Sequence, residues 1–474
     1  MLFNSVEFLL FLPAVFLLYW FVFKKIKSQN LFILFASYLF YGWWDWRFLF
    51  LILASTLVDY YIGIMLLKTS EYKKRKLLLS LSLFFNIGLL VVFKYYNFFI
   101  DNWIYAWDSL GITMHKSSLN IILPVGISFY TFQTLSYTID VYRKNLKGTT
   151  NFIAFASFVS FFPQLVAGPI ERANNLLPQF FKERSFNYKW AVSGMKLILW
   201  GLVKKVIIAD NCAPIVNDVF DNYQNESGLT LVFGAIYFAF QIYGDFSGYS
   251  DIAIGTSRIF GFNLKLNFNY PYFSRDIAEF WRRWHISLST WFRDYLYIPL
   301  GGSRGNKLKQ IRNVFIIFLV SGFWHGANWT FVFWGLLNAL FFLPIFLSKK
   351  NRSNLNIVAE HNIYPSLKEF FYMLITFILT CLAWIVFRSE NIFDAFNYIL
   401  NIFDITNFIP EIIRHKKFLP VLLLFIIVEW FSRKSQIVIL LNGRFRYFFY
   451  ILFIFTILYF SSTENQTSFI YFQF

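Results

Sequence analysis

The stretch from Val314 to Gly335, VFIIFLVSGFWHGANWTFVFWG, constrains the fold more than any other part of the chain. It places one histidine, His325, between two apolar runs that together are long enough to be embedded in a membrane. An imidazole at that depth carries a desolvation cost, which favours a functional role facing the protein interior or a water-filled cavity. The alternative is a histidine that only hydrogen-bonds a neighbouring helix. The stretch therefore predicts a membrane protein and leaves the role of His325 open.

The rest of the chain has the composition that such a stretch requires. Of the 474 residues, 57% are hydrophobic and only 15% are charged. A soluble domain cannot bury so much apolar surface, so lipid must be the solvent for most of the chain. The net charge of +17 comes mostly from short basic runs beside apolar segments, which is typical of cytoplasmic loops and of contacts with lipid headgroups. No nucleic-acid-binding motif accompanies this charge, so we expect no nucleic-acid partner.

Basic residues between the first apolar runs predict the orientation of the chain. The run from Phe8 to Phe23 is followed, not preceded, by lysines, which favours a retained membrane helix over a removed signal peptide. Loops 24–30 and 68–76 are basic and are expected on the cytoplasmic side, while the turn at 45–47 falls on the other side. The N-terminus is therefore predicted to lie outside the cytoplasm.

Apolar runs recur along the chain and predict further membrane helices. They cover residues 31–44, 48–67, 77–93, 152–169, 190–209, 229–255, 370–387, 418–431 and 447–460. Residues 97–120 are aromatic and weakly polar and are predicted to lie outside. Because no long linker or internal repeat interrupts the series, we expect an all-α polytopic membrane protein. A single domain is predicted over residues 1–474, with a histidine-bearing core at about 120–348.

Two runs carry polar side chains that lipid would leave unsatisfied. Residues 123–142 contain Gln133 and several hydroxyl side chains, so this helix is predicted to face other protein. The run at 190–209 is interrupted by Lys204 and Lys205. We expect these two lysines to extend to an interface and the helix to end there.

The run at 229–255 combines small residues with polar side chains at membrane depth. Gly244 and Gly248 have the GxxxG spacing that permits a close approach of two helices. The acidic side chains need partners or water, unless the helix reaches the surface near Gly244 and they are solvated. The polar candidates in this run are Gln241, Asp245 and Asp251.

Residues 281–295, WRRWHISLSTWFRDY, are predicted to form one amphipathic helix. Their aromatic and aliphatic side chains recur every three or four residues, and the arginines lie on other faces. Such a helix is too charged to cross hydrocarbon and suits an interface or a re-entrant element. His285 lies on the flank of its aromatic face, and the basic loop at 303–312 places the element on the cytoplasmic side.

If His285 and His325 face one cavity, the pair is suited to acyl transfer. An imidazole can take a proton from an acceptor hydroxyl as it attacks an ester or thioester carbonyl, and can return it to the leaving group. It can instead accept the acyl group itself. His325 is the better candidate for either role because it is the more deeply placed. His285 is better placed to orient a donor or to assist proton transfer.

The remaining histidines and the cysteines give no sign of a metal site. His115, His361 and His415 lie in polar or mixed stretches and are predicted to be loop residues. Cys212 and Cys381 lie far apart in or beside apolar runs, where small buried side chains are expected. Without an HExxH motif or a Cys/His cluster, we expect neither a bound metal nor a bound cofactor.

Five long motifs run in order over most of the chain. They are Pro124 to Arg143 (PVGISFYTFQTLSYTIDVYR), Phe161 to Arg172 (FFPQLVAGPIER), Tyr243 to Gly255 (YGDFSGYSDIAIG), Phe280 to Gly302 (FWRRWHISLSTWFRDYLYIPLGG) and Ser321 to Trp334 (SGFWHGANWTFVFW). These motifs resemble the membrane-bound O-acyltransferase family and, more narrowly, its bacterial alginate O-acetyltransferase branch. By this resemblance, His325 matches the family's catalytic histidine and His285 matches the second histidine.

The resemblance implies a ring of tilted membrane helices, with re-entrant or interfacial helices, around a thinned centre with a funnel on each side. His325 would lie near the point where the two funnels meet. Side chains near the histidines become candidates for lining the funnel or binding the donor: Arg282, Arg283, Arg293, Trp324 and Asn328. The arginines could pair with donor phosphates or, equally, with lipid phosphates.

The resemblance also implies an inner-membrane acetyltransferase. Acetyl from a cytoplasmic thioester, with acetyl-CoA as the expected donor, would cross the membrane for O-acetylation of an exported or cell-wall polysaccharide. The sequence has no serine hydrolase-type motif, so a separate extracytoplasmic acetyltransferase is expected to complete the transfer. The alternatives are D-alanyl or peptidoglycan-directed transfer, a proton-coupled transporter or flippase, and a structural subunit in which neither histidine matters.

Overall fold

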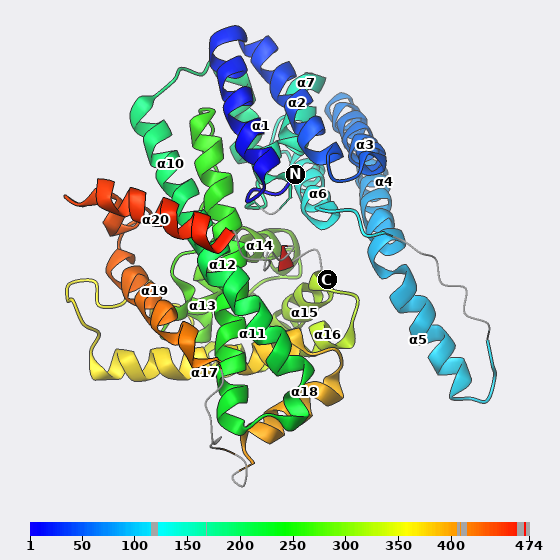
Figure 1. The fold of residues 1–474 in the computed structure, drawn as a ribbon. Coiled ribbons are helices and arrows are strands. Elements are labelled where there is room, and N and C mark those ends of the chain that lie inside the picture. Colours follow the sequence, from blue (N-terminus) through cyan, green and yellow to red (C-terminus); the bar gives the residue numbers. More distant parts are fainter. Residues whose placement is uncertain (115–121, 167, 405–407, 409–414, 462–468, 471–474) are drawn as a thin grey trace. The chain divides into compact units, whose positions relative to one another are not determined.

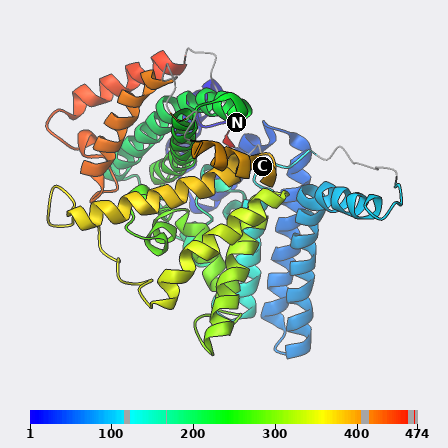
Figure 2. The same ribbon diagram turned by 90° about the horizontal axis from the view of Figure 1, so that it is seen from below.

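The computed structural model describes residues 1–114, 122–166, 168–404, 408, 415–461 and 469–470. In this part of the chain every regular element is a helix (Figures 1 and 2). Five of the described helical segments are long and apolar enough to cross a membrane: Trp46–Lys68, Tyr72–Asp108, Gly228–Ile259, Trp329–Leu347 and Leu367–Arg388. The predicted all-α polytopic class is confirmed, while the ring around a funnel stays a prediction.

The chain divides into two compact units. The first comprises Met1–Val192 with Thr256–Lys265, and the second comprises Ser193–Gly255 with Leu266–Phe474. The single domain expected over residues 1–474 stays a prediction.

Helices of the first unit follow the predicted apolar runs. They are α1 (Val6–Leu17), α2 (Ile26–Gly42), α3 (Leu49–Lys68), α4 (Tyr72–Leu90), α5 (Tyr96–Asp108), α6 (Ile127–Tyr142), α7 (Phe152–Ser160), α8 (Phe162–Leu165) and α9 (Ala173–Leu176). Two runs differ from the expectation. The fourth continues through a π-helical turn, Val91–Tyr95, into α5, and the run at 152–169 is broken at Phe161 into two short helices.

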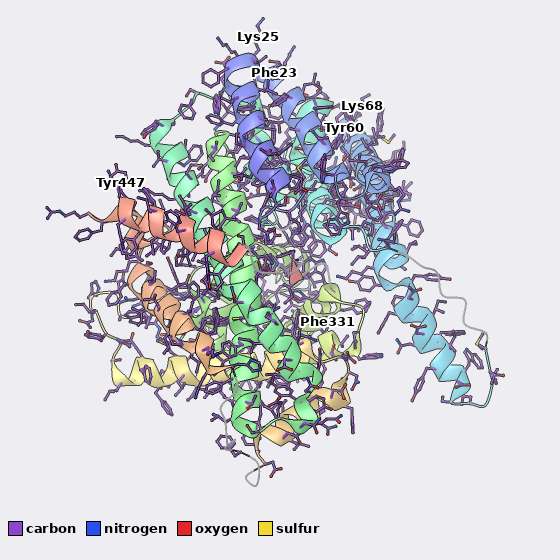
Figure 3. All side chains as sticks on the ribbon, viewed as in Figure 1. Phe23, Lys25, Tyr60, Lys68, Phe331 and Tyr447 are labelled. Carbon is purple, nitrogen blue, oxygen red and sulfur yellow. The ribbon has the colours of Figure 1, made fainter. Side chains whose placement is uncertain are left out.

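Arg75 holds two helix ends together at the basic end of the first unit. Its guanidinium donates to the carbonyl of Thr69 after α3, at 3.1 Å, and to that of Tyr142 at the end of α6, at 2.8 Å. These carbonyls have no partner within their own helices, so the guanidinium satisfies them. Lys25 and Lys68, from the two basic loops, are labelled in Figure 3. The common side of the loops at 24–30 and 68–76 stays a prediction.

Helix α6 faces protein along nearly its whole length, as predicted. Gln133 Nε2 donates to the carbonyl of Phe158 at 2.5 Å, and Thr138 Oγ1 donates to Asp59 Oδ1 at 2.9 Å. Gly126 starts the helix with φ +76°, and a Cβ there would lie 2.8 Å from the carbonyl oxygen of Leu165. Only glycine combines that backbone conformation with so close a neighbour.

The second unit carries both candidate histidines. Its helices are α10 (Tyr188–Leu202) from Ser193 onward, α11 (Asp210–Asp221), α12 (Gly228–Ile259) up to Gly255, α13 (Ile277–Arg283), α14 (Ile286–Phe292), α15 (Lys307–His325), α16 (Trp329–Leu347), α17 (Leu367–Arg388), α18 (Ile392–Ile402), α19 (Leu419–Ser432) and α20 (Arg446–Ser461). A π-helical segment, Val203–Ala209, joins α10 to α11.

Small residues let α10 and α12 approach each other closely. A Cβ on Gly248 would lie 2.7 Å from the carbonyl oxygen of Gly201, and one on Gly244 would lie 2.9 Å from that of Lys204. The predicted GxxxG contact is therefore confirmed. The prediction that the helix ends at Lys204 and Lys205 was wrong, because the chain stays helical through the π-helical segment into α11.

Candidate active site

His285 breaks the helix predicted over residues 281–295. Helix α13 ends at Arg283, α14 begins at Ile286, and His285 between them has φ +43°. A left-handed backbone is costly for a residue with a side chain, so its surroundings must hold it. The backbone N–H of Ile286 donates to the carbonyl of Asn267 at 2.9 Å, and the backbone N–H of Asn269 donates to the carbonyl of Arg283 at 2.9 Å. The single amphipathic helix was therefore a wrong prediction.

Asn267 also fixes which nitrogen of His285 carries the proton. The backbone N–H of Ser287 donates to Asn267 Oδ1 at 3.2 Å, so the side-chain atom that faces His285 is an oxygen. This oxygen lies 3.1 Å from His285 Nδ1 and can only accept, which assigns the proton to Nδ1. Asn267 Nδ2 is held in turn by Ser250 Oγ at 3.1 Å. The lone pair of the neutral ring is therefore on Nε2.

Burial keeps the His285 ring neutral. The residue has no exposed surface and lies edge-on to Phe246, with ring centroids 4.6 Å apart. Removal from water disfavours the imidazolium and lowers the pKa of His285 to about 3. The sequence places this histidine beside arginines on a flank, whereas the structure buries it completely.

His325 is the last residue of α15, and the turn that follows it is tightly fixed. Asn328 caps α16 by accepting from the backbone N–H of Thr330 at 3.0 Å, and its amide donates to the carbonyl of Glu390 at 2.9 Å. The His325 ring lies 5.1 Å from Trp334 on α16 and 5.6 Å from Phe387 on α17. Asn328 therefore shapes the turn beside the imidazole.

Trp324 lies against both imidazoles. Its ring centroid is 6.3 Å from that of His285 and 5.0 Å from that of His325. Around them, Trp384 packs 5.8 Å from Trp334 and 5.1 Å from Trp284. The structure thus brings the two histidines into one aromatic compartment, which the sequence alone does not establish. Both imidazoles are thereby held away from bulk water.

The three candidate arginines have different surroundings. Arg283 pairs with Glu279 at 2.8 Å, and Arg282 donates to the backbone carbonyls of Asn351 and Asn354 at 2.7 and 2.8 Å. Both guanidiniums thus have partners inside the protein. Arg293, 56% exposed, pairs with the neighbouring Asp294.

The acidic candidates on α12 belong to a buried ionic cluster. Asp251 pairs with Lys204 at 2.8 Å, while Asp245 pairs with Lys205 at 2.8 Å. Lys205 also pairs with Asp210 at 2.8 Å. The acids are therefore not solvated, and the expectation that the lysines reach an interface was wrong. The third polar candidate, Gln241, is buried in the same helix.

The other histidines lie away from this compartment. His361 and His415 are in turns, as predicted, while His115 lies outside the described residues. His415 Nε2 contacts Asp218 at 2.9 Å. Sequence reasoning missed Asn267, because a single Asn in a loop matches no motif. It gave Ser250, which lies in the Tyr243 to Gly255 motif, no role beside His285.

Comparisons with known proteins agree with this architecture. The chain matches the membrane-bound O-acyltransferase family over residues 38–387. It is 41% identical over 394 residues to the probable alginate O-acetylase of Pseudomonas aeruginosa, covering 83% of this chain and 73% of that protein. It is 36% identical to the peptidoglycan O-acetyltransferase of Helicobacter pylori, covering 83% and 78% of the two chains.

A more distant likeness covers less of the chain. The teichoic acid D-alanyltransferase of Streptococcus thermophilus is 30% identical over 238 residues, 48% of this chain and 56% of that protein. The family match covers more than half of the sequence, and apolar helices of spanning length accompany it. This chain therefore belongs to the membrane-bound O-acyltransferase family and is a multi-pass membrane enzyme that performs O-acyl transfer.

Proposed function

We propose that this enzyme takes acetyl from a cytoplasmic thioester, with acetyl-CoA as the donor, for O-acetylation of an exported or cell-wall polysaccharide. The relatives that align with 83% of this chain are named for O-acetylation of alginate or peptidoglycan. The likeness to a D-alanyltransferase covers only 48% of the chain. This difference in coverage favours acetyl over D-alanyl as the transferred group.

One observation carries the proposed site: Trp324 contacts the rings of both His285 and His325. Two imidazoles in one compartment can share the proton steps of acyl transfer. His325 takes the proton of an acceptor hydroxyl, on the molecule that passes acetyl to the separate extracytoplasmic acetyltransferase, as the new C–O bond forms. When the C–S bond breaks, the proton passes to the leaving thiolate.

His285 assists this transfer with a ring of fixed orientation. Its Nδ1–H is held by Asn267, so Nε2 is the nitrogen that can accept a hydrogen bond and orient the reacting group. An alternative path forms an acyl-imidazole on His325 before the hydroxyl attacks. Either path uses the same two rings.

The location and the partner are further parts of the proposal. We assign the enzyme to the bacterial inner membrane with its N-terminus outside, because the loops at 24–30 and 68–76 are basic and the turn at 45–47 between them is not. We assign the last step, transfer to the polymer, to a separate extracytoplasmic acetyltransferase.

The test is polymer-bound O-acetyl ester in cells that express wild type, His325→Ala or His285→Ala at matched membrane levels. We expect ester to be lost with His325→Ala and strongly reduced with His285→Ala. His361→Ala is the matched control, because His361 is exposed in a turn. Undiminished ester in the His325→Ala cells contradicts the proposed site.

The donor is tested separately in inverted membrane vesicles supplied with radiolabelled acetyl-CoA. Label should enter the vesicle lumen or its polymer with wild type and not with His325→Ala. Transfer from a D-alanyl-charged carrier protein, with none from acetyl-CoA, contradicts the proposed donor and favours the D-alanyl reaction.

A further inference from the structure

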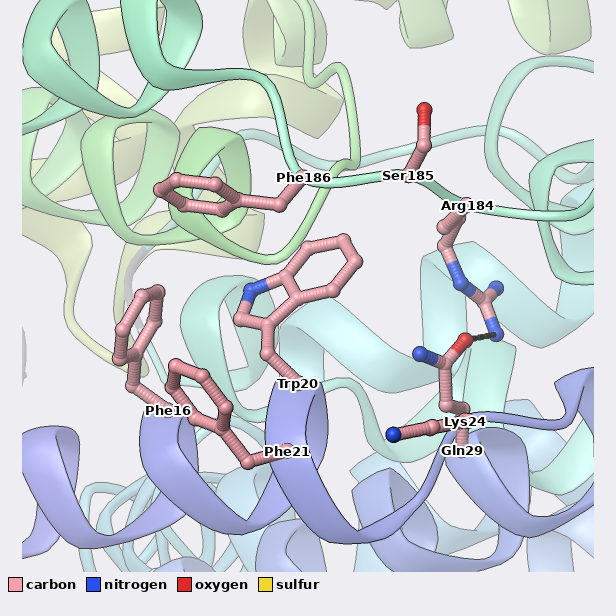
Figure 4. A pocket seen from close by; sticks show the side chains of 8 residues that line it. All are labelled: Phe16, Trp20, Phe21, Lys24, Gln29, Arg184, Ser185 and Phe186. Carbon is pink, nitrogen blue, oxygen red and sulfur yellow. Dashed lines mark hydrogen bonds between the residues drawn. The ribbon is translucent and has the colours of Figure 1, made fainter.

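A cavity of about 350 Å³ opens in the first unit, between the end of α1 and the segment 184–186. Figure 4 shows its two contrasting sides. Aromatic rings gather on one side, and Lys24, Gln29 and Arg184 lie on the other. The cavity is therefore amphipathic.

Packing fixes the aromatic side in place. The indole N–H of Trp20 donates to the carbonyl of Ile259 at 3.1 Å. The ring of Phe186 lies 5.6 Å from that of Trp20 and 5.8 Å from that of Phe16. These rings form a preformed apolar wall, which a hydrocarbon chain can cover without reordering the side chains.

Two cations without a carboxylate partner form the opposite side. Arg184 Nη2 donates to Asn30 Oδ1 at 2.6 Å and to Gln29 Oε1 at 3.4 Å, and Nη1 donates to the carbonyl of Gln179 at 3.2 Å. The guanidinium also lies 4.7 Å from the Phe262 ring, so neutral groups hold it and no carboxylate neutralises its charge. Within the described residues no acidic side chain forms an ion pair with Arg184 or Lys24. An anion that reached both would interact with the Lys24 ammonium and with the second N–H of Arg184 Nη1, without competition from a carboxylate.

The cavity continues an apolar stripe that leads away from it along α1. Leu9 and Leu10 are 70% exposed, Leu17 is 54% exposed and Phe21, which also lines the cavity, is 68% exposed. In a membrane enzyme, a stripe of this kind faces acyl chains. Lys24 follows directly after the apolar helix and its π-helical turn, so the two cations lie where hydrocarbon gives way to headgroups.

We propose that this cavity binds an anionic phospholipid, with the headgroup phosphate between Lys24 and Arg184 and an acyl chain along Phe21 and the exposed stripe of α1. Basic pockets beside membrane helices favour anionic over zwitterionic headgroups. A soluble phosphate lacks the chain that the aromatic wall would cover. The site is thus expected to require the whole lipid, and it is independent of the chemistry at the histidines.

The test is native mass spectrometry of the full chain, titrated with phosphatidylglycerol or phosphatidylethanolamine of identical acyl chains. Wild type should retain one phosphatidylglycerol more tightly than phosphatidylethanolamine. Lys24→Gln should weaken the binding of phosphatidylglycerol about fivefold, which is the effect of losing one cation near the headgroups. Lys25→Gln is the matched control, because Lys25 has the same charge and the adjacent position but does not line the cavity. It should change binding less than about twofold.

A second variant reverses the charge. Ser185 is exposed and lines the cavity, so Ser185→Glu adds a carboxylate without disturbing the core and should abolish the preference for the anionic lipid. The proposal would be overturned if Lys24→Gln and Lys25→Gln lost affinity for phosphatidylglycerol equally. So would an unchanged preference in Ser185→Glu, or displacement of the lipid by millimolar inorganic phosphate.

Discussion

The ammonium of Lys205 lies 2.8 Å from Asp245 Oδ1, with both side chains almost completely buried. Lys205 also pairs with Asp210, and the backbone N–H of Ile470 donates to Asp245 Oδ2 at 2.7 Å. A buried charge is tolerated only when partners replace the water it has lost. This cluster therefore ties α12 to α11 and to the described end of the chain.

Replacing Lys205 by Met should destabilise the fold strongly. The change leaves Asp210 and Asp245 facing each other without their cation, and breaking a buried pair in this way costs about 3 to 5 kcal/mol. The thermal unfolding midpoint of the purified protein in detergent measures the loss. Lys205→Met combined with Asp245→Asn should recover part of it, because one of the two carboxylates is neutralised. A midpoint no lower than that of Lys189→Met, which changes an exposed lysine, would contradict the prediction.

Most helices could be predicted because their apolar runs are long and short groups of basic residues mark where several of the runs end. The cluster around Lys205 could not, because a lysine near an apolar run looks the same whether it extends to an interface or finds acids on another helix. Only the packing of α10 against α12 distinguishes the two cases.

The candidate site was predictable in part. His285 and His325 stand out as the histidines nearest apolar segments, but their contact through Trp324 depends on tertiary structure. The break at His285 was missed, because the aromatic spacing of residues 281–295 continues across it. Asn267 was missed because nothing in its own stretch marks it as a partner of His285.

Glycine at position 248 is expected to be required for the packing of α10 against α12. A Cβ there would lie 2.7 Å from the carbonyl oxygen of Gly201, so Gly248→Ala must force two backbones apart and should cost about 1 to 3 kcal/mol. Gly88→Ala in α4 is the matched control, because nothing lies within 4 Å of its added Cβ. Helix propensity should make that variant as stable as wild type or more stable, by up to about 1 kcal/mol. Equal unfolding midpoints for the two variants would contradict this account.

Asn267→Asp should change the pH dependence of acyl transfer. A carboxylate facing Nδ1 stabilises the imidazolium and raises the pKa of His285, by about 1 to 3 units for a close opposite charge. The neutral ring is then lost at a higher pH, so the acid limb of the rate profile should move upward. Initial rates of acetyl transfer in reconstituted vesicles between pH 5 and 8, a range of about 3 units around the ordinary pKa of histidine, measure the shift.

Ser287→Ala is the control for Asn267→Asp. It removes a hydroxyl that also donates to Asn267 Oδ1, at 2.8 Å, but adds no charge beside His285. The acid limb of its pH–rate profile should lie at the same pH as that of wild type. If Asn267→Asp has the same acid limb as wild type while it remains active, the contact with Asn267 does not control the proton on His285.

Burial of His285 predicts that the fold loses stability in acid. Its pKa is lowered to about 3 by burial, whereas the ordinary value in an unfolded chain is about 6.5. Between these two values the unfolded chain binds a proton that the folded protein does not, so the free energy of unfolding falls as the pH drops through this window. One group contributes a slope of up to about 1.4 kcal/mol per pH unit. His285→Asn should flatten the decline of the unfolding midpoint, since Asn tolerates the left-handed backbone at this position without titrating. His361→Asn, an exposed change, should leave the decline as in wild type, and parallel declines for all three proteins would exclude His285 as its source.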